Sequence, residues 1–250
     1  MEKPLIYDLD LLELSSQLKE WGEPNFRARQ IWQGLYQSLW NTPDQFSNLP
    51  QGLRDKLGAK FSFSNLTPAT VQKSLDGETQ KTLFHLPDGQ PIETVRMRYE
   101  KRRTLCISSQ SGCAMGCVFC ATGQMGFLRN LSSGEIVEQV LYFARKLADE
   151  GDQVTNIVVM GMGEPFHNYV ATLAAIDRLN HPNGMKLGAR RFTISTVGLV
   201  PAIERFAKEK RQINLAISLH AADDKLRSSM LPINKRYPIA ALLTAVKNYT

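Results

Sequence analysis

The sequence predicts an α/β protein in which a parallel sheet, curled into part of a barrel, follows a small all-helical segment and a β-hairpin connector. Hydrophobic residues recur at helical spacing up to about residue 65, and the spacing changes to two from there to about residue 100. Beyond it, short apolar strands alternate with amphipathic helices, which implies a parallel sheet. We therefore expect a helical domain (1–65), a β connector (66–100) and an α/β core (101–250).

Residues 1–65 read as three helices. Leucines between positions 9 and 18 precede a break at Gly22 and Pro24, an aromatic-rich helix runs from Phe26 to about Trp40, and a short one follows Pro50. We interpret the aromatic stripe as the core of this domain rather than as a platform for stacked bases. Contact between its arginines and RNA stays open.

Residues 66–100 read as strands joined by two turns, D-G-E-T and P-D-G-Q. This connector brings Glu93 just ahead of the cysteine-rich loop that follows.

Four strands are expected in the core, at 105–108, 156–160, 191–195 and 213–219. Ser132 and Glu135 have the spacing of a capping box, which predicts that a helix starts there. Ligands of parallel sheets bind at the carboxyl ends of the strands. Unusual residues gather at those ends: the cysteine loop, residues 161–164, residues 195–196 and residues 218–220.

All four cysteines lie between residues 106 and 120, and Cys113, Cys117 and Cys120 have the spacing C-x3-C-x2-C. Thiolates this close on one loop can converge on one metal centre. Structural zinc sites and electron-carrying iron–sulfur clusters use four protein ligands. If three cysteines hold a 4Fe-4S cluster, one of its four irons has no protein ligand. Cys106 as a fourth zinc ligand is less favoured, because the predicted strand carries it away from the loop. Disulfide pairing is less favoured still, because nothing in the chain indicates an oxidising compartment.

The chain of 250 residues has a formal net charge of +6 and a pI near 9.2, which favours a polyanionic partner. Residues 1–17 do not resemble a signal peptide, and no stretch reaches the roughly 20 apolar residues of a membrane span. We expect a cytoplasmic monomer with no membrane contact. Basic side chains that could contact phosphates cluster at residues 101–103, 186–191, 208–211 and 235–236.

The loop C-x3-C-V-F-C resembles the signature of the radical S-adenosylmethionine (SAM) enzymes. That resemblance implies a 4Fe-4S cluster whose free iron is chelated by the amino and carboxylate groups of SAM. One electron from the cluster then cleaves SAM and releases a 5'-deoxyadenosyl radical.

Longer strings resemble the dual-specificity RNA methyltransferases of the RlmN type over nearly the whole chain: T-L-C-I-S-S-Q-S-G-C, M-G-M-G-E-P, T-I-S-T-V-G, L-A-I-S-L-H-A and L-P-I-N-K-R-Y-P. The resemblance implies a six-stranded radical SAM barrel that methylates carbon 2 of an adenine in 23S rRNA and of an adenine beside the anticodon of tRNA. An electron donor such as flavodoxin is implied as well. Carbon 2 is electron-poor, so the cofactors carry the difficult chemistry. One SAM methylates a carrier cysteine, and a second yields the radical that activates that methyl group.

Carried over by position, Cys113, Cys117 and Cys120 would hold the cluster. Glu93 would be the general base that takes the carbon 2 proton, and Cys106 would attack the carrier cysteine, leaving a transient disulfide. Without the resemblance, Glu93 is a solvated strand-end glutamate, and the residues assigned to SAM close ordinary strand ends. The residues that would line SAM are Gly163, Glu164, Ser195, Ser218, Leu219 and His220.

The four cysteines leave no candidate for the methyl carrier, which the family places further along its chain together with an asparagine that helps to hold SAM. We therefore expect an incomplete chain that cleaves SAM slowly and transfers no methyl group. Two rival functions stay open. One is the Cfr-like methylation of carbon 8 of the same ribosomal adenine. The other is a non-catalytic RNA-binding protein with a structural metal site.

Overall fold

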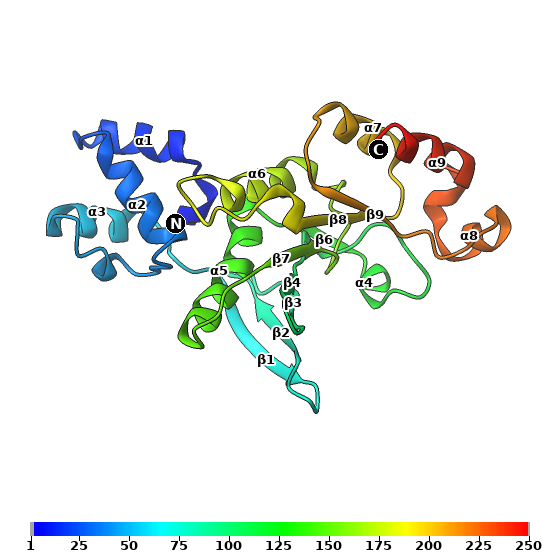
Figure 1. Cartoon of the computed structure of the whole chain (residues 1–250), viewed down its shortest axis with the longest axis horizontal. Coiled ribbons are helices and arrows are strands. Elements are labelled where there is room, and N and C mark those ends of the chain that lie inside the picture. The colour runs from blue at the N-terminus through cyan, green and yellow to red at the C-terminus, as the bar shows by residue number, and fades with distance from the viewer. Residues whose placement is uncertain (1–2, 250) are drawn as a thin grey trace.

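A single twisted sheet of seven strands, in the order β1-β2-β3-β4-β7-β8-β9, runs through the computed structural model, which describes residues 3–249 (Figure 1). A two-stranded ribbon, β5-β6, lies beside it. The strands are β1 (Thr67–Lys73), β2 (Thr79–His85), β3 (Pro91–Arg98), β4 (Arg103–Cys106), β5 (Gln110–Gly112), β6 (Phe127–Asn130), β7 (Asn156–Val159), β8 (Phe192–Thr196) and β9 (Asn214–Ile217).

Strands β4, β7, β8 and β9 are parallel, which confirms the α/β fold class and the partial barrel. Each lies within about two residues of its expected position. The chain crosses between these strands through helices, as parallel pairing requires.

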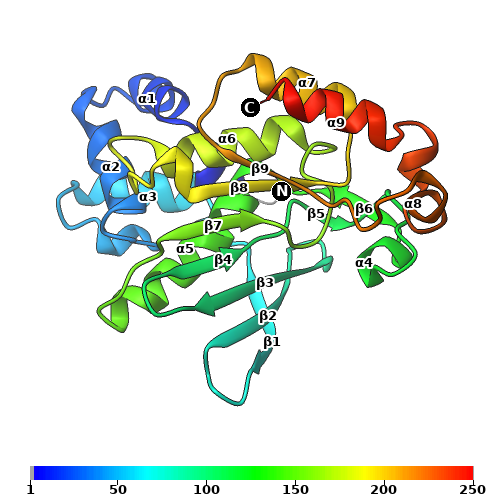
Figure 2. The same ribbon diagram turned by 45° about the vertical axis from the view of Figure 1, so that its right-hand side comes forward.

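The helices lie mainly in the crossovers and at the two ends of the chain (Figures 1 and 2). They are α1 (Leu11–Glu20), α2 (Phe26–Tyr36), α3 (Gln51–Lys60), α4 (Ala121–Gln124), α5 (Ser133–Asp149), α6 (Tyr169–Asn180), α7 (Val200–Lys208), α8 (Asp224–Met230) and α9 (Ile239–Lys247). Four short 3-10 helices are η1 (Ile6–Asp8), η2 (Pro43–Gln45), η3 (Ala189–Arg191) and η4 (Pro232–Lys235). No helix among residues 3–249 is long and apolar enough to span a bilayer.

The N-terminal helices α1–α3 gather at the end of the molecule opposite to α8 and α9 (Figure 1). Trp32 and Tyr36 of α2 are each only 1% exposed and pack with their rings 4.5 Å apart. Phe26, which starts the same stripe, is 54% exposed. The interpretation of the stripe as core therefore holds for its buried members and not for Phe26.

The β connector is part of the same sheet as the core. Strand β3 pairs antiparallel with β4, with Val95 opposite Cys106, so the sheet continues without interruption from β9 to β1. The β1-β2 hairpin projects away from the helices (Figure 1). All of β1 is exposed. The sequence predicted these strands but not their pairing with the core.

The two faces of the sheet differ. One face buries Ile157, Val159, Phe192 and Ile194 against the helices, and α5 covers much of it. Side chains alternate along a strand, so the opposite face carries Cys106, Ser195 and their neighbours, which are half-buried. The helix α5 begins at Ser132, and both hydrogen bonds of the predicted capping box are present. The face turned away from the helices is therefore the one available to ligands.

Candidate active site at the strand ends

The cysteine loop connects β5 to α4 and is fixed at several points. The amide of Cys113 donates to the carbonyl of Gly126 (2.9 Å), which closes the loop against the start of β6. The amide of Val118 donates to the carbonyl of Met230 at the end of α8 (3.0 Å). Cys113 and Cys117 are buried, and Cys120 is half-buried. The loop thus presents its thiols in a held conformation.

The three loop thiols lie close enough to affect one another. Burial, followed by the neighbouring Cys113 and Cys120, raises the pKa of Cys117 to about 11. Burial likewise raises the pKa of Cys113. All four cysteines are free thiols, so no disulfide exists among residues 3–249. The transient disulfide that the resemblance implies for Cys106 has no cysteine partner in this part of the chain.

The donor set decides which group fits the loop. No three His, Cys, Asp or Glu side chains in the described part of the chain are arranged to hold a single metal ion. A structural zinc site has four ligands converging on one ion. Three neighbouring thiols that affect one another's pKa, but are not arranged around a single ion, fit a 4Fe-4S cluster, in which separate thiolates bind separate irons. The residues present therefore fit the cluster better than zinc.

Cys106 is the last residue of β4, and β5 separates it in sequence from the cysteine loop. Burial raises its pKa to about 11, against a hydrogen bond from the backbone of Met160. Since Val95 opposes Cys106 across the β3-β4 pair, Glu93 lies on the same face two residues before Val95. The structure thus places Cys106 and Glu93 on one half-buried face.

Glu93 makes two contacts. Its carboxylate pairs with Lys81 at 3.0 Å, and its backbone carbonyl accepts a hydrogen bond from Ser108 Oγ at 2.6 Å. The Glu93 side chain is 39% exposed. It lies on the hairpin side of the site and makes no hydrogen bond to the cysteine loop among the described residues.

The G-M-G-E-P segment follows β7 and packs against the chain that leads into the cysteine loop. Gly163 has φ +100°, and an added Cβ would lie 2.5 Å from Gln110 Cβ. Glu164 is 2% exposed. Its two carboxylate oxygens accept the amides of Phe166 (3.0 Å) and Val197 (2.9 Å). Burial raises the pKa of Glu164, and the hydrogen bonds oppose this.

The carboxylate of Glu164 is therefore a buried link between the loops after β7 and β8, which the sequence did not predict. The side chain of Thr196 is a third donor to this carboxylate, which can accept about four hydrogen bonds in all.

The ends of β8 and β9 meet as predicted. Ser195 Oγ and Ser218 Oγ lie 3.2 Å apart. The ring of His220 lies 4.6 Å from that of Phe119 on the cysteine loop, and His220 has φ +59°. Leu219, between Ser218 and His220 in the sequence, is 36% exposed. These strand ends and the cysteine loop are thus adjacent.

Three buried side chains hold this arrangement and are not among the site residues predicted from the sequence. The amide of Gln139 on α5 pairs with the backbone of Ser108, accepting from its amide at 2.8 Å and donating to its carbonyl at 3.0 Å. Asn168 donates to the carbonyls of Ser109 and Leu131, each at 2.8 Å. The signal that could have indicated Gln139 is a polar residue among the apolar positions of α5, which also buries Glu135 and Glu138.

Arg227 on α8 is the third. It is fully buried and donates to the carbonyls of Leu219 (3.1 Å) and Val197 (2.6 Å) and to Asn234 Oδ1. It therefore ties the loops after β8 and β9 to α8. Burial lowers its pKa, against the attraction of Asp224.

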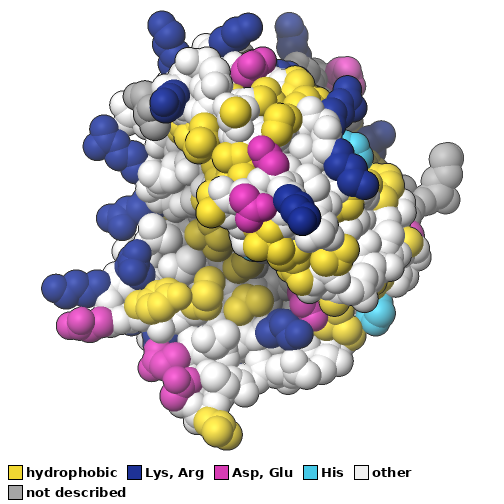
Figure 3. Space-filling model, turned by 90° about the vertical axis from the view of Figure 1, so that its right-hand side faces the viewer, with side chains coloured by type: hydrophobic (Ala, Val, Ile, Leu, Met, Phe, Trp, Pro, Cys, Tyr) yellow, Lys and Arg dark blue, Asp and Glu magenta, His cyan; other side chains and the backbone are white. Residues whose placement is uncertain are grey.

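The side of the molecule that carries α4 and α8 is hollowed, with hydrophobic side chains inside the hollow and Lys and Arg side chains along one side of it (Figure 3). Several of the exposed apolar side chains lie on the cysteine loop, at the end of α4, on β6 or at the strand ends: Val118, Phe119, Met125, Phe127, Met160 and Leu219. Such a surface fits a large ligand with apolar and anionic parts.

The barrel and the three-cysteine loop place the chain in a known class. Residues 107–250 match the family model of the radical SAM superfamily, and residues 6–62 match that of the ribosomal RNA large subunit methyltransferase N-terminal domain. A radical SAM methyltransferase from Sphaerobacter thermophilus superposes with a TM-score of 0.95 at 50% identity, covering 98% of this chain and 72% of that one.

Curated relatives narrow the class. One from Chloroflexus aurantiacus, described as a probable dual-specificity RNA methyltransferase RlmN, is 54% identical over 100% of this chain and 67% of its own length. A relative from Bacillus cereus with the same description is 47% identical over 100% of this chain and 68% of its own. The chain belongs to the RlmN family of radical SAM RNA methyltransferases.

Replacement of Gly163 tests the close contact between the G-M-G-E-P segment and Gln110. The matched control is Gly151→Ala, at a left-handed glycine with open space around it. We expect Gly151→Ala to lower the free energy of unfolding by about 1 kcal/mol through backbone strain. Gly163→Ala should lower it by about 2–4 kcal/mol, because the new Cβ also overpacks against Gln110. Urea unfolding measures both, and equal losses would show that the contact is unimportant.

Proposed function

We propose that this protein uses a 4Fe-4S cluster and SAM to methylate carbon 2 of adenine in 23S rRNA and in tRNA. The observation that carries the proposal is the position of the three-cysteine loop. It lies at the carboxyl ends of the parallel strands, beside the Glu164 segment, in a chain of the RlmN family. Family membership supports this assignment of carbon 2 and of both RNAs.

Cys113, Cys117 and Cys120 would hold the cluster and leave one iron for SAM. When bound, cluster and SAM would supply the 5'-deoxyadenosyl radical, and a flavodoxin-type protein is the proposed electron donor. The chain's own residues bind and orient. The remaining acceptor capacity of Glu164 suits the ammonium group of SAM. Gly163 brings the backbone close, and the remaining contacts would come from Ser195, Ser218, Leu219 and His220.

Glu93 and Cys106 would complete the reaction after the carrier methyl has joined the base. Glu93 takes the proton from carbon 2. The sulfur of Cys106 forms a disulfide with the carrier sulfur as the carbon–sulfur bond to RNA breaks. Their position on one half-buried face supports these paired roles. The carrier is none of the four cysteines in these 250 residues, since each has another role.

The basic groups divide by their place in the fold. Residues 101–103, 186–191 and 208–211 precede β4, β8 and β9, at the amino ends of the parallel strands. Arg103 and Arg211 are engaged internally with acidic side chains. Lys235 and Arg236 are exposed beside η4, whose Pro232 approaches Gly116 of the cysteine loop. We assign Lys235 and Arg236 to the phosphates near the target base, and residues 1–65 to more distant RNA contacts.

Single cysteine replacements test the cluster assignment. Cys113→Ala, Cys117→Ala and Cys120→Ala should each lose most of the bound iron and slow 5'-deoxyadenosine release at least about tenfold, because each removes a ligand. Cys106→Ala is the matched control and should retain both. The measurements are iron and sulfide content after anaerobic reconstitution and SAM cleavage with dithionite. Zinc in place of iron, or iron lost in Cys106→Ala alone, would refute the assignment.

Analysis of modified RNA tests the target atom and the base. The whole enzyme should form 2-methyladenosine in 23S rRNA and tRNA fragments, detected by nuclease digestion and mass spectrometry. Glu93→Gln should keep SAM cleavage and accumulate the RNA–protein adduct, because the carbon 2 proton stays in place. The matched control is Glu78→Gln, at an exposed position of the same hairpin. Formation of 8-methyladenosine instead would establish the rival function.

A further inference from the structure

Glu93 lies on β3 of the seven-stranded sheet and the cysteine loop follows β5 of the two-stranded ribbon, yet the proposed reaction needs both at one adenine. Three contacts join β3 and the turn before it to the flanks of the loop. Ser108 Oγ donates to the carbonyl of Glu93, and Ser111 Oγ donates to the carbonyl of Pro91 (2.8 Å). The third contact is an ion pair between Asp88, in the β2-β3 turn, and Arg129 on β6. It is the only charged contact of the three.

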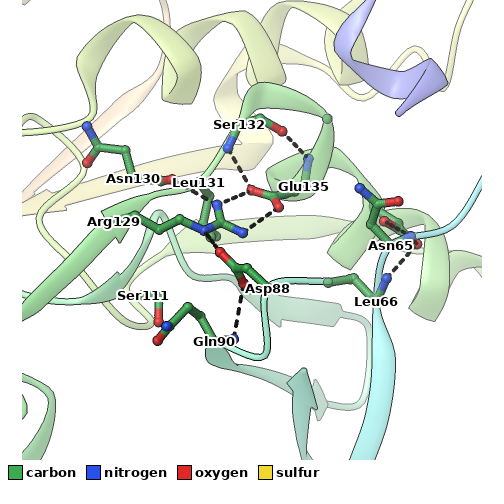
Figure 4. Close-up of polar contacts among 12 residues, drawn as sticks. Asn65, Leu66, Asp88, Gln90, Ser111, Arg129, Asn130, Leu131, Ser132 and Glu135 are labelled. Carbon is green, nitrogen blue, oxygen red and sulfur yellow. Dashed lines mark hydrogen bonds and ion pairs between the residues drawn. The ribbon is translucent and has the colours of Figure 1, made fainter. Parts of the chain in front are cut away.

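Arg129 is anchored at its other end. Its Nη1 and Nη2 donate to the two carboxylate oxygens of Glu135, each at 2.8 Å, in the bidentate geometry that fixes a guanidinium most firmly. One Glu135 oxygen also accepts the amide of Ser132 in the capping box at the start of α5. Figure 4 shows the guanidinium between the carboxylates of Glu135 and Asp88. Helix α5 therefore holds Arg129, and Arg129 in turn positions the β2-β3 turn through Asp88.

Asp88 organises the turn with its other oxygen. Asp88 Oδ1 accepts the amide of Gln90 at 3.1 Å, while Oδ2 meets Arg129 Nε. The turn is closed by the amide of Leu86, which donates to the carbonyl of Gln90 at 2.9 Å. Strand β3 starts at the next residue and reaches Glu93 two residues later. Movement of Asp88 would thus pass directly into the strand that carries the proposed base.

We propose that Arg129 is a positioning residue that ties the Asp88 turn to β6 and so sets Glu93 at the proper distance from the cluster and SAM. The inference rests on the proposed role of Glu93. The cysteine loop keeps its own anchors at Cys113 and Val118, so cluster binding and SAM cleavage do not depend on the tie. Removal of the carbon 2 proton by Glu93 does depend on the tie.

Asp88→Asn is the more specific variant, because it removes the charge at the turn and leaves the Arg129–Glu135 pair intact. Arg129→Gln removes the whole bridge. Matched controls are Asp177→Asn and Arg211→Gln. Arg211 also joins two carboxylates, those of Asp177 and Glu209, and its side chain is 28% exposed against 30% for Arg129. Asp88→Glu restores a carboxylate and serves as the rescue.

Two readouts are measured on the whole enzyme. In hydrogen exchange, peptides covering residues 86–94 should exchange faster in Asp88→Asn and Arg129→Gln and be unchanged in both controls. In RNA methylation, kcat should fall about tenfold to hundredfold, the cost of a small misplacement of a reacting group. The KM for RNA and the SAM cleavage rate without RNA should stay unchanged. Asp88→Glu should recover most of kcat and of the protection.

The outcomes separate the inference from the proposed function. Unchanged exchange at residues 86–94 would overturn the tie, as would an equal fall in SAM cleavage without RNA, which would indicate a general structural role. A wild-type enzyme that makes no 2-methyladenosine would refute the proposed function, and the exchange data would still decide whether Arg129 holds the turn.

Discussion

Four buried residues between β4 and the cysteine loop, 108–111, impose the constraint on which the site depends. They are at most 1% exposed, and their polar groups need partners because water cannot supply them. Partners come from every side: Gln139 on α5, Asn168 at the start of α6, the carbonyl of Met162 after β7 and that of Pro91 on β3. Except for Ser109 Oγ, which has no hydrogen-bond partner among residues 3–249, these contacts pair the segment and bring together the elements that build the site.

The same constraint separates rigid from adjustable parts. Glu164 and Arg227 continue the buried network across the ends of β7, β8 and β9, each linking two loops through backbone groups. Losing one partner of such a network leaves the others unpaired, which costs more than the bond itself contributes. The Glu93 carbonyl joins the network through Ser108 Oγ, whereas the side chains of Glu93 and His220 lie outside it and are at least partly exposed. The network therefore fixes the backbone of the strand-end loops and leaves these two side chains outside it.

The order of elements follows from hydrophobic period and turn residues, so the fold class, the four parallel strands and the capping box at Ser132 were predictable. The convergence of the strand ends follows from parallel topology, and the Ser195–Ser218 contact confirms it. The roles of Gln139 and Arg227 were not predictable, because a buried polar side chain looks like a surface residue until its partners, far apart in sequence, are known. The inward turn of Glu164 escaped prediction for the same reason. The assignment of residues to cluster and SAM stays a prediction.

The proposed function requires one iron that lacks a protein ligand and binds SAM through its amino and carboxylate groups. Electron–nuclear double resonance on the reduced cluster tests this directly, with SAM labelled by ¹⁵N at the amino group or ¹⁷O at the carboxylate. The account predicts hyperfine coupling from both labels in the reconstituted protein. A reduced cluster that shows coupling to neither label while SAM is bound would contradict it.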